Sequence, residues 1–319
     1  MTRKKLLKAF SLIEISMVIL IMGILILGIS SGLDLYYDSR VSSAKALTQN
    51  SRVRRIPDLM LWFDSVSSNV YSIDSDFKDK IEIDDNIKIS KWKDLSAEKN
   101  NALQTNSNFQ PVFQKNSINN IHSLYFNGIN DFLEFSGNFL IGKNYTIFAV
   151  EKKKNCASNK NCSIIGGVIE GAFALFALNS HLLNFGYYGS DKIRYSNYHS
   201  QTNLFSEFTF SKNNQPNIHN IIFTSEYGFI YWINNSILAS DYNKKTPLAS
   251  YSKARIAQKQ NEYYNGNIGE IIIFDRNLSE KERFDVTEYL SKKWAIETDK
   301  TLYNEIQVIN NNTPQSSDM

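Results

Sequence analysis

The sequence predicts an α+β protein in which a long N-terminal α-helix is followed by a mainly-β antiparallel sandwich and a short C-terminal helix. Three observations lead to this fold class. An apolar run spans residues 12–29. From about Leu59, short segments rich in aromatic and β-branched residues are separated by Asn, Gly, Ser and Asp, which is typical of strands and turns. Helical periodicity returns only near the end of the chain, so we expect two packed layers of antiparallel strands.

The composition fits a folded protein with a membrane segment. The chain has 319 residues and a hydrophobic content of 42%, which suits a large packed core and excludes a wholly disordered protein. Its 35 basic and 32 acidic residues leave a formal charge of +3, so the overall charge calls for no nucleic-acid partner. Arg3, Lys4, Lys5 and Lys8 precede the apolar run without an acid among them. This asymmetry predicts a cytoplasmic N-terminus and a head on the other side of the membrane.

The apolar run 12–29 is close to the ~20 residues that a membrane-spanning helix needs. A cleaved signal peptide is the alternative, but the run is longer than a signal core of roughly 7–15 residues. Its end, ISSGLDLYYDSR, also has no clear small-x-small cleavage site. Beyond the run, apolar residues recur at spacings of three and four as far as Pro57. We therefore expect one helix that leaves the bilayer and ends before Pro57.

The segment KAFSLIE, residues 8–14, directly precedes the apolar run and resembles the prepilin N-terminus of type IV pilins and type II secretion pseudopilins. The resemblance implies that a prepilin peptidase/methylase removes a basic leader, residues 1–9, on the cytoplasmic side of the membrane. The cut would fall between Ala9 and Phe10, and Phe10 would be N-methylated. Residues 10–56 would then form the transmembrane and assembly helix. The chain departs from the family in having Ala9 where Gly is usual and no Pro within the helix.

Glu14 matches the family's glutamate, at the fifth position of the mature chain. A charged side chain at the centre of a bilayer costs about 2.5–3.5 kcal/mol, less near a helix end, and is tolerated chiefly when paired. We expect the Glu14 carboxylate to neutralise the α-amine of Phe10 on a neighbouring subunit and so to favour assembly over isolated monomers. The alternative is an interfacial acid near the helix start, stabilised by the helix dipole.

The order of motifs over residues 59–296 resembles that of the laminin-G-like, concanavalin-A-like jelly-roll domains of bacterial surface proteins. The motifs are LMLWFDS, ISKWKDLSAEKNNALQ, SLYFNGINDFLEF, YTIFAVEKK and GNIGEIIIFDRNLSEKERFDVTEYLSKKW. The resemblance implies a jelly-roll sandwich over residues 57–297. Residues 298–319 are rich in Asn, Ser and Thr and are expected to form a flexible tail.

Two local patterns inside this domain predict its connections. Asn234 and Asn235 lie between two strand-like runs, and both residues tolerate the left-handed conformations of a tight hairpin. Ser279 and Glu282 have the spacing of a capping box. We therefore expect a hairpin at the first pair and the start of a short C-terminal helix at the second.

Asp94 and Asp131 are the candidate ligand-binding residues of the head. Both lie in loop segments, where a carboxylate could bind calcium or a sugar hydroxyl. The alternative is that each forms a turn, because Asp bonds its own backbone there. No clustered set of oxygen ligands accompanies them in the sequence. We therefore assign no cofactor and no metal, with calcium as the one candidate, and the fold alone names no ligand.

Cys156 and Cys162 bracket ASNKN between two strand-like runs. Two ligands are too few for a closed zinc site, and a head outside the cytoplasm favours a disulfide. Two free thiols are the alternative. The four histidines have no metal-ligand spacing, and they are His122, His181, His199 and His219.

A glycoside hydrolase is the enzymatic alternative, because such enzymes occur in this fold class. Glu82 and Asp84 would lie on one face of a strand. The glucanases that the pair resembles place a further Glu just beyond it, whereas this chain has Asn86 and Ile87. Since the acid needed for two-carboxylate hydrolysis is missing there, we expect no catalytic site.

Together these features predict a pilin-like or pseudopilin-like structural subunit, of minor or tip type, whose lectin-like head serves adhesion or substrate docking. Its expected partners are the prepilin peptidase/methylase, other pilin or pseudopilin subunits, the inner membrane, and a glycan or protein ligand. We expect a single pass through the inner membrane, a periplasmic or extracellular head, and a place in a surface filament after assembly. The alternatives are a membrane-anchored lectin-like protein that never polymerises and, third, a glycoside hydrolase.

Overall fold

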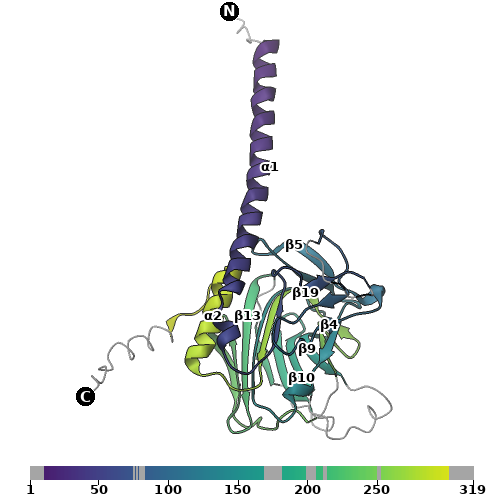
Figure 1. Ribbon diagram of the computed structural model, residues 1–319, viewed down its shortest axis with the longest axis vertical. Coiled ribbons are helices and arrows are strands. Elements are labelled where there is room, and N and C mark those ends of the chain that lie inside the picture. Colours follow the sequence, from purple (N-terminus) through teal and green to yellow (C-terminus); the bar gives the residue numbers. More distant parts are fainter. Residues whose placement is uncertain are drawn as a thin grey trace, which may run out of the picture.

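The computed structural model describes residues 11–74, 76, 78, 83–168, 182–198, 206–210, 214–249 and 253–301. It consists of a long helix α1 (Leu12–Gln49), an antiparallel two-sheet sandwich and a short helix α2 (Glu280–Trp294). Figure 1 shows α1 projecting away from the head, with only its last turns lying against it, beside α2. The predicted α+β fold class is confirmed, and the sandwich is open rather than closed into a barrel.

Helix α1 begins with a capping box. The Ser11 hydroxyl accepts a hydrogen bond from the Glu14 backbone N–H at 3.2 Å, and a Glu14 carboxylate oxygen accepts one from the Ser11 N–H at 2.8 Å. These two bonds satisfy backbone donors that have no partner in the first turn of a helix. The start of α1 is therefore fixed by local sequence.

The end of α1 differs from the single helix over 10–56 that we expected. Asn50 caps the helix, and its side-chain amide donates to the carbonyl oxygen of Ala46 at 3.0 Å. Ser51 then caps a separate 3₁₀ turn, η1 (Arg52–Arg55), which leads to Pro57. The apolar spacing continues into η1, where Val53 is also buried. Polar capping at Asn50 and Ser51 thus ends the helix earlier than the apolar spacing predicts.

The larger part of the core lies between two antiparallel sheets. The first, sheet A, has the order β15-β14-β13-β8-β19-β6-β5, and β1 also pairs with β19. Its strands are β1 (Leu59–Asp64), β5 (Val112–Ile118), β6 (Ile121–Asn127), β8 (Tyr145–Asn155), β13 (Pro216–Thr224), β14 (Gly228–Ile233), β15 (Ser236–Asp241) and β19 (Asn265–Phe274). The second, sheet B, has the order β12-β11-β10-β9-β16-β7-β4-β3-β2. Its strands are β2 (Tyr71–Ser72), β3 (Lys91–Trp92), β4 (Ala102–Leu103), β7 (Leu133–Ser136), β9 (Asn161–Val168), β10 (Leu182–Tyr188), β11 (Lys192–Tyr198), β12 (Ser206–Thr209) and β16 (Lys253–Ile256).

Short elements complete the head. The hairpin β17 (Gln258–Lys259) and β18 (Glu262–Tyr263) forms a two-stranded sheet, and η2 (Ser107–Phe109) and η3 (Asn138–Leu140) are single 3₁₀ turns. The predicted hairpin lies between β14 and β15, where Asn234 and Asn235 have φ angles of 49° and 67°. The predicted capping box of Ser279 and Glu282 begins α2. Both local predictions are confirmed.

Side-chain alternation gives sheet A two buried faces. In β19, Ile271 and Ile273 belong to the core between the sheets, while Ile272 and Phe274 belong to a second core outside them. That second core is covered by α2 and by the end of α1. The helical residues that it contains include Val41, Ala44, Val286, Leu290 and Trp294. The sandwich therefore holds its two helices against the outer face of sheet A.

The C-terminal segment remains attached to the head beyond residue 297. The backbone N–H of Asp299 donates to the carbonyl oxygen of Asn234 at 2.8 Å, and the Ser236 hydroxyl donates to an Asp299 carboxylate oxygen at 3.1 Å. Residues 298–301 thus pack on the β14–β15 turn rather than beginning the expected tail. The rest of that tail, 302–319, lies outside the described residues.

Candidate functional site

The first half of α1 presents an exposed apolar surface. Within the described part of the chain, Leu12–Arg55 is the helical stretch long and apolar enough to span a membrane, and its most apolar 18-residue window has a mean hydropathy of 2.8. Every described side chain of residues 12–29 is exposed, and exposed apolar residues continue through Leu33, Leu35 and Tyr36. Such a surface needs lipid or other helices to cover it.

Glu14 lies in the first turn of this apolar helix. In the single chain its carboxylate bonds the backbone of Ser11, which places the negative charge at the positive end of the helix dipole. Ala9 and Phe10, the residues of the predicted cleavage, lie outside the described residues, as does the leader 1–9. The pairing of Glu14 with a neighbouring subunit stays a prediction.

The second half of α1 contacts the head through a buried polar cluster on the outer face of sheet A. Lys293 of α2 lies at its centre, with Nζ 2.6 Å from Asp64 Oδ1 and 2.8 Å from Glu270 Oε2. The Thr48 hydroxyl of α1 donates to Asp64 Oδ2 at 3.1 Å and contacts the Tyr289 hydroxyl at 3.1 Å. We call Thr48, Asp64, Glu270, Tyr289 and Lys293 the junction cluster.

The two carboxylates of the junction cluster share one lysine, and their pKa values move in opposite directions. Burial disfavours the charge of Asp64, but the Lys293 charge and hydrogen bonds from Lys293 and Ser67 hold the Asp64 pKa below its ordinary value. Burial raises the pKa of Glu270, and the Lys293 charge only partly offsets it while the Asp64 charge adds to it. Glu270 is therefore the carboxyl that more readily holds a proton.

A second buried polar cluster lies between the sheets. Glu151 Oε1 accepts hydrogen bonds from Tyr187 at 2.7 Å and from His219 Nε2 at 2.9 Å, and Oε2 accepts one from Tyr264 at 2.5 Å. Glu151 is 0% exposed and His219 1%. Burial works against ionisation, but the bonds and charge of His219, with the tyrosine hydroxyls, hold the Glu151 pKa below its ordinary value. This core cluster ties β8 and β13 of sheet A to β10 of sheet B.

An open groove of about 640 Å³ crosses β4, β7 and β16 on the outer face of sheet B. Its lining combines amides, hydroxyls, charged groups and apolar side chains. These residues are Asn101, Leu103, Gln104, Thr105, Phe132, Glu134, Phe135, Ser136, Lys253 and Arg255. Because β16 alternates, Lys253 and Arg255 point to the groove while Ala254 and Ile256 enter the core. The groove is thus on the opposite side of the sandwich from α1 and α2.

Charged side chains are ordered along the groove floor. Glu134 bonds both cations, with Oε1 2.7 Å from Lys253 Nζ and Oε2 2.9 Å from Arg255 Nε. The Arg255 guanidinium also lies 4.5 Å from the centroid of the Phe132 ring and donates to Gln258 at 2.7 Å. These bonds hold the side chains of the groove in defined positions, and such order lowers the cost of binding at a site.

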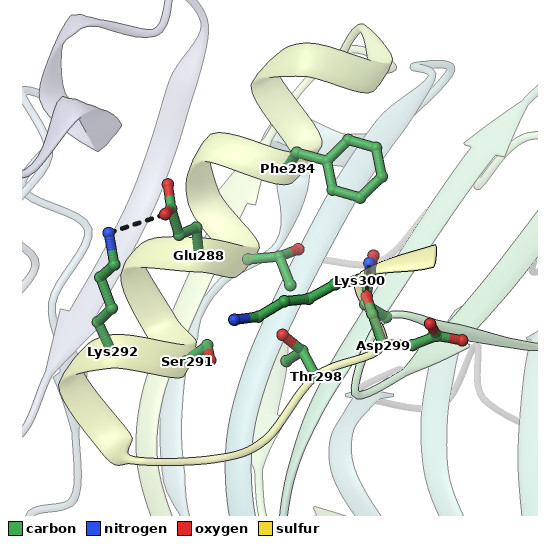
Figure 2. Close-up of a pocket in the computed structure, with 9 residues that line it drawn as sticks. Phe284, Glu288, Ser291, Lys292, Thr298, Asp299 and Lys300 are labelled. Carbon is green, nitrogen blue, oxygen red and sulfur yellow. Dashed lines mark hydrogen bonds and ion pairs between the residues drawn. The ribbon is translucent and has the colours of Figure 1, made fainter. Parts of the chain in front are cut away.

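A smaller hollow of about 130 Å³ lies between α2 and residues 298–300. Figure 2 shows the Lys300 side chain extending across it toward α2, and Glu288 bonded to Lys292 at its edge. Phe284 lies at the other end of the hollow. Because an exposed lysine from the chain itself occupies part of this space, the groove on sheet B is the better candidate binding site.

The predicted ligand residues of the head both accept hydrogen bonds from backbone N–H groups. Asp94 Oδ1 accepts from the Trp62 N–H at 2.8 Å, and its Oδ2 accepts from the Asn100 N–H at 2.9 Å. Asp131 is 5% exposed and accepts from the Asn127 N–H at 3.0 Å, and burial raises its pKa to about 6. Within the described ranges, no three His, Cys, Asp or Glu side chains gather as a metal site.

The other predicted residues are placed as follows. Cys156 and Cys162 form a disulfide with a Cα–Cα distance of 5.9 Å, closing the turn between β8 and β9. Asp84 is exposed, while Glu82, its partner in the hydrolase alternative, lies outside the described residues, as do His181 and His199. His122 is partly buried, where desolvation and the charges of nearby lysines lower its pKa to about 4.

Sequence reasoning missed the groove and both buried clusters. One signal was available: Glu270 interrupts the apolar strand GNIGEIIIF, and Asp64 ends LMLWFD. A charged side chain within an apolar strand needs a buried partner. That partner, Lys293, lies 229 positions from Asp64 and 23 from Glu270, among the other charged residues of the last helix.

Comparison with known proteins supports the fold. No protein-family model matches the sequence, and no curated protein matches it. Among solved structures, Trypanosoma rangeli sialidase with 2,3-difluorosialic acid is 13% identical, with a TM-score of 0.50 over 76% of this chain and 34% of the sialidase chain. The binding domain of botulinum neurotoxin DC in complex with SialylT is 14% identical, with a TM-score of 0.49 over 74% of this chain and 52% of that chain.

A third neighbour is domain 4 of AbnA, a GH43 extracellular arabinanase from Geobacillus stearothermophilus, in complex with arabinotriose. It is 10% identical, with a TM-score of 0.45 over 73% of this chain and 98% of that domain. This chain spans about a third of the length of the sialidase. At such identities the likeness shows a β-sandwich fold and no activity.

Proposed function

We propose that this chain is a pilin-like or pseudopilin-like subunit that α1 holds in the inner membrane before assembly, and whose head binds a glycan. The observation that carries the proposal is the division of α1 into two halves. Residues 12–29 are exposed and apolar, with Glu14 in their first turn, whereas Val41 and Thr48 are buried against the head. Such a helix can exchange lipid for neighbouring helices while the head keeps its structure.

The arrangement of the head supports a binding role. The helices cover the outer face of sheet A, and the groove opens on the outer face of sheet B, so helix packing and ligand binding use opposite surfaces. Sugars carry many hydroxyls around apolar ring faces. The amide of Asn101, the hydroxyl of Ser136 and the carboxylate of Glu134 can bond hydroxyls, while Leu103 and Phe132 offer apolar contact. This mixture is what small polar ligands need.

Removing only the charge of Glu14 tests the assembly half of the proposal. Glu14→Gln keeps a side chain that can complete the capping box but loses the charge proposed to neutralise Phe10 of a neighbour. We expect normal membrane insertion, a mature N-terminus at methylated Phe10, and incorporation into filaments reduced by about tenfold or more, the effect of ~1.4 kcal/mol. Immunoblots of membrane and sheared-filament fractions, with mass spectrometry of the N-terminus, measure these quantities.

Ser11→Ala is the matched control, because it removes the cap hydroxyl and leaves the charge. It should enter filaments as the wild type does. Normal incorporation of Glu14→Gln would contradict the assembly role of Glu14. A mature chain that begins at Met1, or near Ser31, would contradict the pilin-like proposal itself and favour an anchored protein or a secreted head.

Blocking the groove tests the binding half. Ser136 is exposed on β7 and lines the groove, so Ser136→Tyr should obstruct it and weaken glycan binding by about tenfold or more, given that a lost polar contact costs ~1–3 kcal/mol. A glycan array probed with the detergent-solubilised full chain identifies the ligand, and titration gives the affinities. Ser240→Tyr, at an exposed position of β15 on sheet A, is the control. A wild-type chain that binds no glycan, or equal binding by both variants, would contradict the role of the groove.

A further inference from the structure

The junction cluster brings an amine and a carboxylate into reacting distance inside the protein. Lys293 Nζ is 2.6 Å from Asp64 Oδ1, and Glu270 Oε2 is 2.8 Å from the same nitrogen. Lys293 and Asp64 are 0% exposed and Glu270 is 1% exposed. We propose that Lys293 and Asp64 form an intramolecular amide cross-link, with Glu270 as the acid–base group that moves the proton.

The reaction is a condensation that balances without any other reactant. A C–N bond forms between Cγ of Asp64 and Nζ of Lys293, and the Cγ–Oδ1 bond breaks. An ammonium and a carboxylate become an amide, and Oδ1 leaves as water with two of the three ammonium protons. Glu270 first takes one proton from the ammonium, which frees the lone pair of Nζ to attack, and delivers that proton to Oδ1. Once the C–N bond has formed, a second proton passes from Nζ through the same carboxyl to Oδ1, which then leaves as water. General acid–base transfer of this kind requires a carboxyl within hydrogen-bond reach of the nucleophile.

Hydrogen-bond donors surround the second oxygen of Asp64, Oδ2, which would carry the negative charge of the tetrahedral intermediate. Oδ2 accepts hydrogen bonds from the Ser67 N–H at 3.1 Å, the Ser67 hydroxyl at 2.5 Å and the Thr48 hydroxyl at 3.1 Å. Three donors aimed at one oxygen stabilise the negative charge that develops there when the amine adds to the carbonyl carbon. The leaving Oδ1, by contrast, faces Lys293 and the Val66 N–H.

Glu270 is itself fixed in place by buried donors. Its Oε1 accepts from Trp62 Nε1 and from the Tyr289 hydroxyl, each at 2.7 Å, and its Oε2 accepts from Trp294 Nε1 at 2.8 Å. Burial raises the pKa of this carboxyl above its ordinary value, which favours its taking up a proton from the neighbouring amine. The register of sheet A pairs Asp64 directly with Glu270, which sets the geometry from the backbone.

Lys293 differs from the lysines of surface ion pairs because water is excluded from its surroundings. Water competes with condensation by solvating both charges and by hydrolysing the product, and a closed apolar site removes that competition. Lys153 offers an internal comparison, because it is also 0% exposed. Its Nζ donates to the Ser190 carbonyl oxygen at 2.9 Å and lies 3.9 Å from the centroid of the Tyr187 ring. The groups beside the Lys153 amine are thus a backbone carbonyl and an aromatic ring, whereas those beside the Lys293 amine are two carboxylates.

Mass spectrometry of the full chain, extracted from membranes in detergent, tests the cross-link. We expect a digest of the wild type to contain a joined peptide pair carrying Asp64 and Lys293, lighter than the sum of its parts by the mass of one water. Because both peptides come from the head, detecting the joined pair does not depend on N-terminal processing or on filament assembly. Asp64→Asn should give the same product with loss of ammonia in place of water.

Variants assign the roles of the other groups. Glu270→Gln keeps the volume and one acceptor oxygen but cannot carry the proton, so we expect the joined peptide to form at least about a hundredfold more slowly, the size of a general acid–base contribution. Lys153→Met should leave the joined peptide at the wild-type level. Near-ultraviolet circular dichroism confirms that each variant is folded. Separate, unmodified Asp64 and Lys293 peptides from a folded wild-type chain would overturn the proposal, and full cross-linking in Glu270→Gln would overturn the role of Glu270.

Discussion

Replacing Lys293 with methionine is expected to lower the free energy of unfolding of the head by about 3–5 kcal/mol, because removing one partner leaves buried charge unneutralised. The change leaves Asp64 and Glu270 side by side without a cation, at 0% and 1% exposure. The expectation holds for the ion pair and for the amide alike, because Lys293 neutralises Asp64 in both. Denaturant unfolding followed by tryptophan fluorescence measures the loss, since Trp62 and Trp294 bond Glu270 directly.

The neighbouring lysine provides the control for this prediction. Lys292 precedes Lys293 on α2, but its side chain is 62% exposed and pairs with Glu288, itself 52% exposed. An exposed pair of this kind contributes roughly 0.3–0.5 kcal/mol, so Lys292→Met should unfold almost as the wild type does. Equal stability of the two variants would contradict the structural role of the junction cluster.

The second large effect is expected from Glu151→Ala, which removes the common acceptor of the core cluster. The donors of His219, Tyr187 and Tyr264 would lose their partner inside the sandwich. A broken buried pair costs about 3–5 kcal/mol. Glu98→Ala, in an exposed loop position, should change stability by less than about 0.5 kcal/mol. A loss from Glu151→Ala no larger than that from Glu98→Ala would refute the role of this cluster.

The core cluster also predicts how stability depends on pH. The pKa of Glu151 is held below its ordinary value in the folded head, so the unfolded chain takes up the proton first as pH falls. The stabilisation is therefore fully present above the unfolded pKa of about 4.3 and is lost as pH falls through the lower, folded pKa. We expect the denaturant concentration at the unfolding midpoint of the wild type to decrease as pH is lowered from 7 through this range. The midpoint of Glu151→Ala should not show the decrease that Glu151 causes.

Local chemistry allowed much of the fold to be predicted. The spacing of Ser279 and Glu282 predicts the start of α2, and paired asparagines predict the β14–β15 turn, because capping and positive φ depend on residues a few positions apart. The end of α1 was predicted less well. Apolar periodicity continued to Val53, whereas the capping groups of Asn50 and Ser51 interrupt the backbone bonds of the helix. Where two local signals conflicted, the polar cap determined the boundary.

The functional geometry depended on contacts between distant residues. Glu151 and His219 are 68 positions apart, and Asp64 and Lys293 are 229 apart. In the sequence, Glu151 begins EKKK after an apolar strand and reads as a solvated strand end. It is buried because Tyr187 of the opposite sheet and His219 of the neighbouring strand enclose it. One sequence gives the alternation of each strand but not which strands become neighbours, so neither cluster nor the groove could be derived from it.

The first and last elements of the head, β1 and α2, lie together beside the end of α1, and this arrangement has a mechanical consequence. Helix α1 leads through η1 to β1, β1 pairs with β19, and α2 follows β19 and returns to the end of α1. A pull along α1 therefore enters the sandwich at β1 and passes directly to the long strand β19, while the bond between Asp64 of β1 and Lys293 passes part of the load to α2. Tension is then borne within this corner of sheet A, on the opposite side of the sandwich from the groove on sheet B.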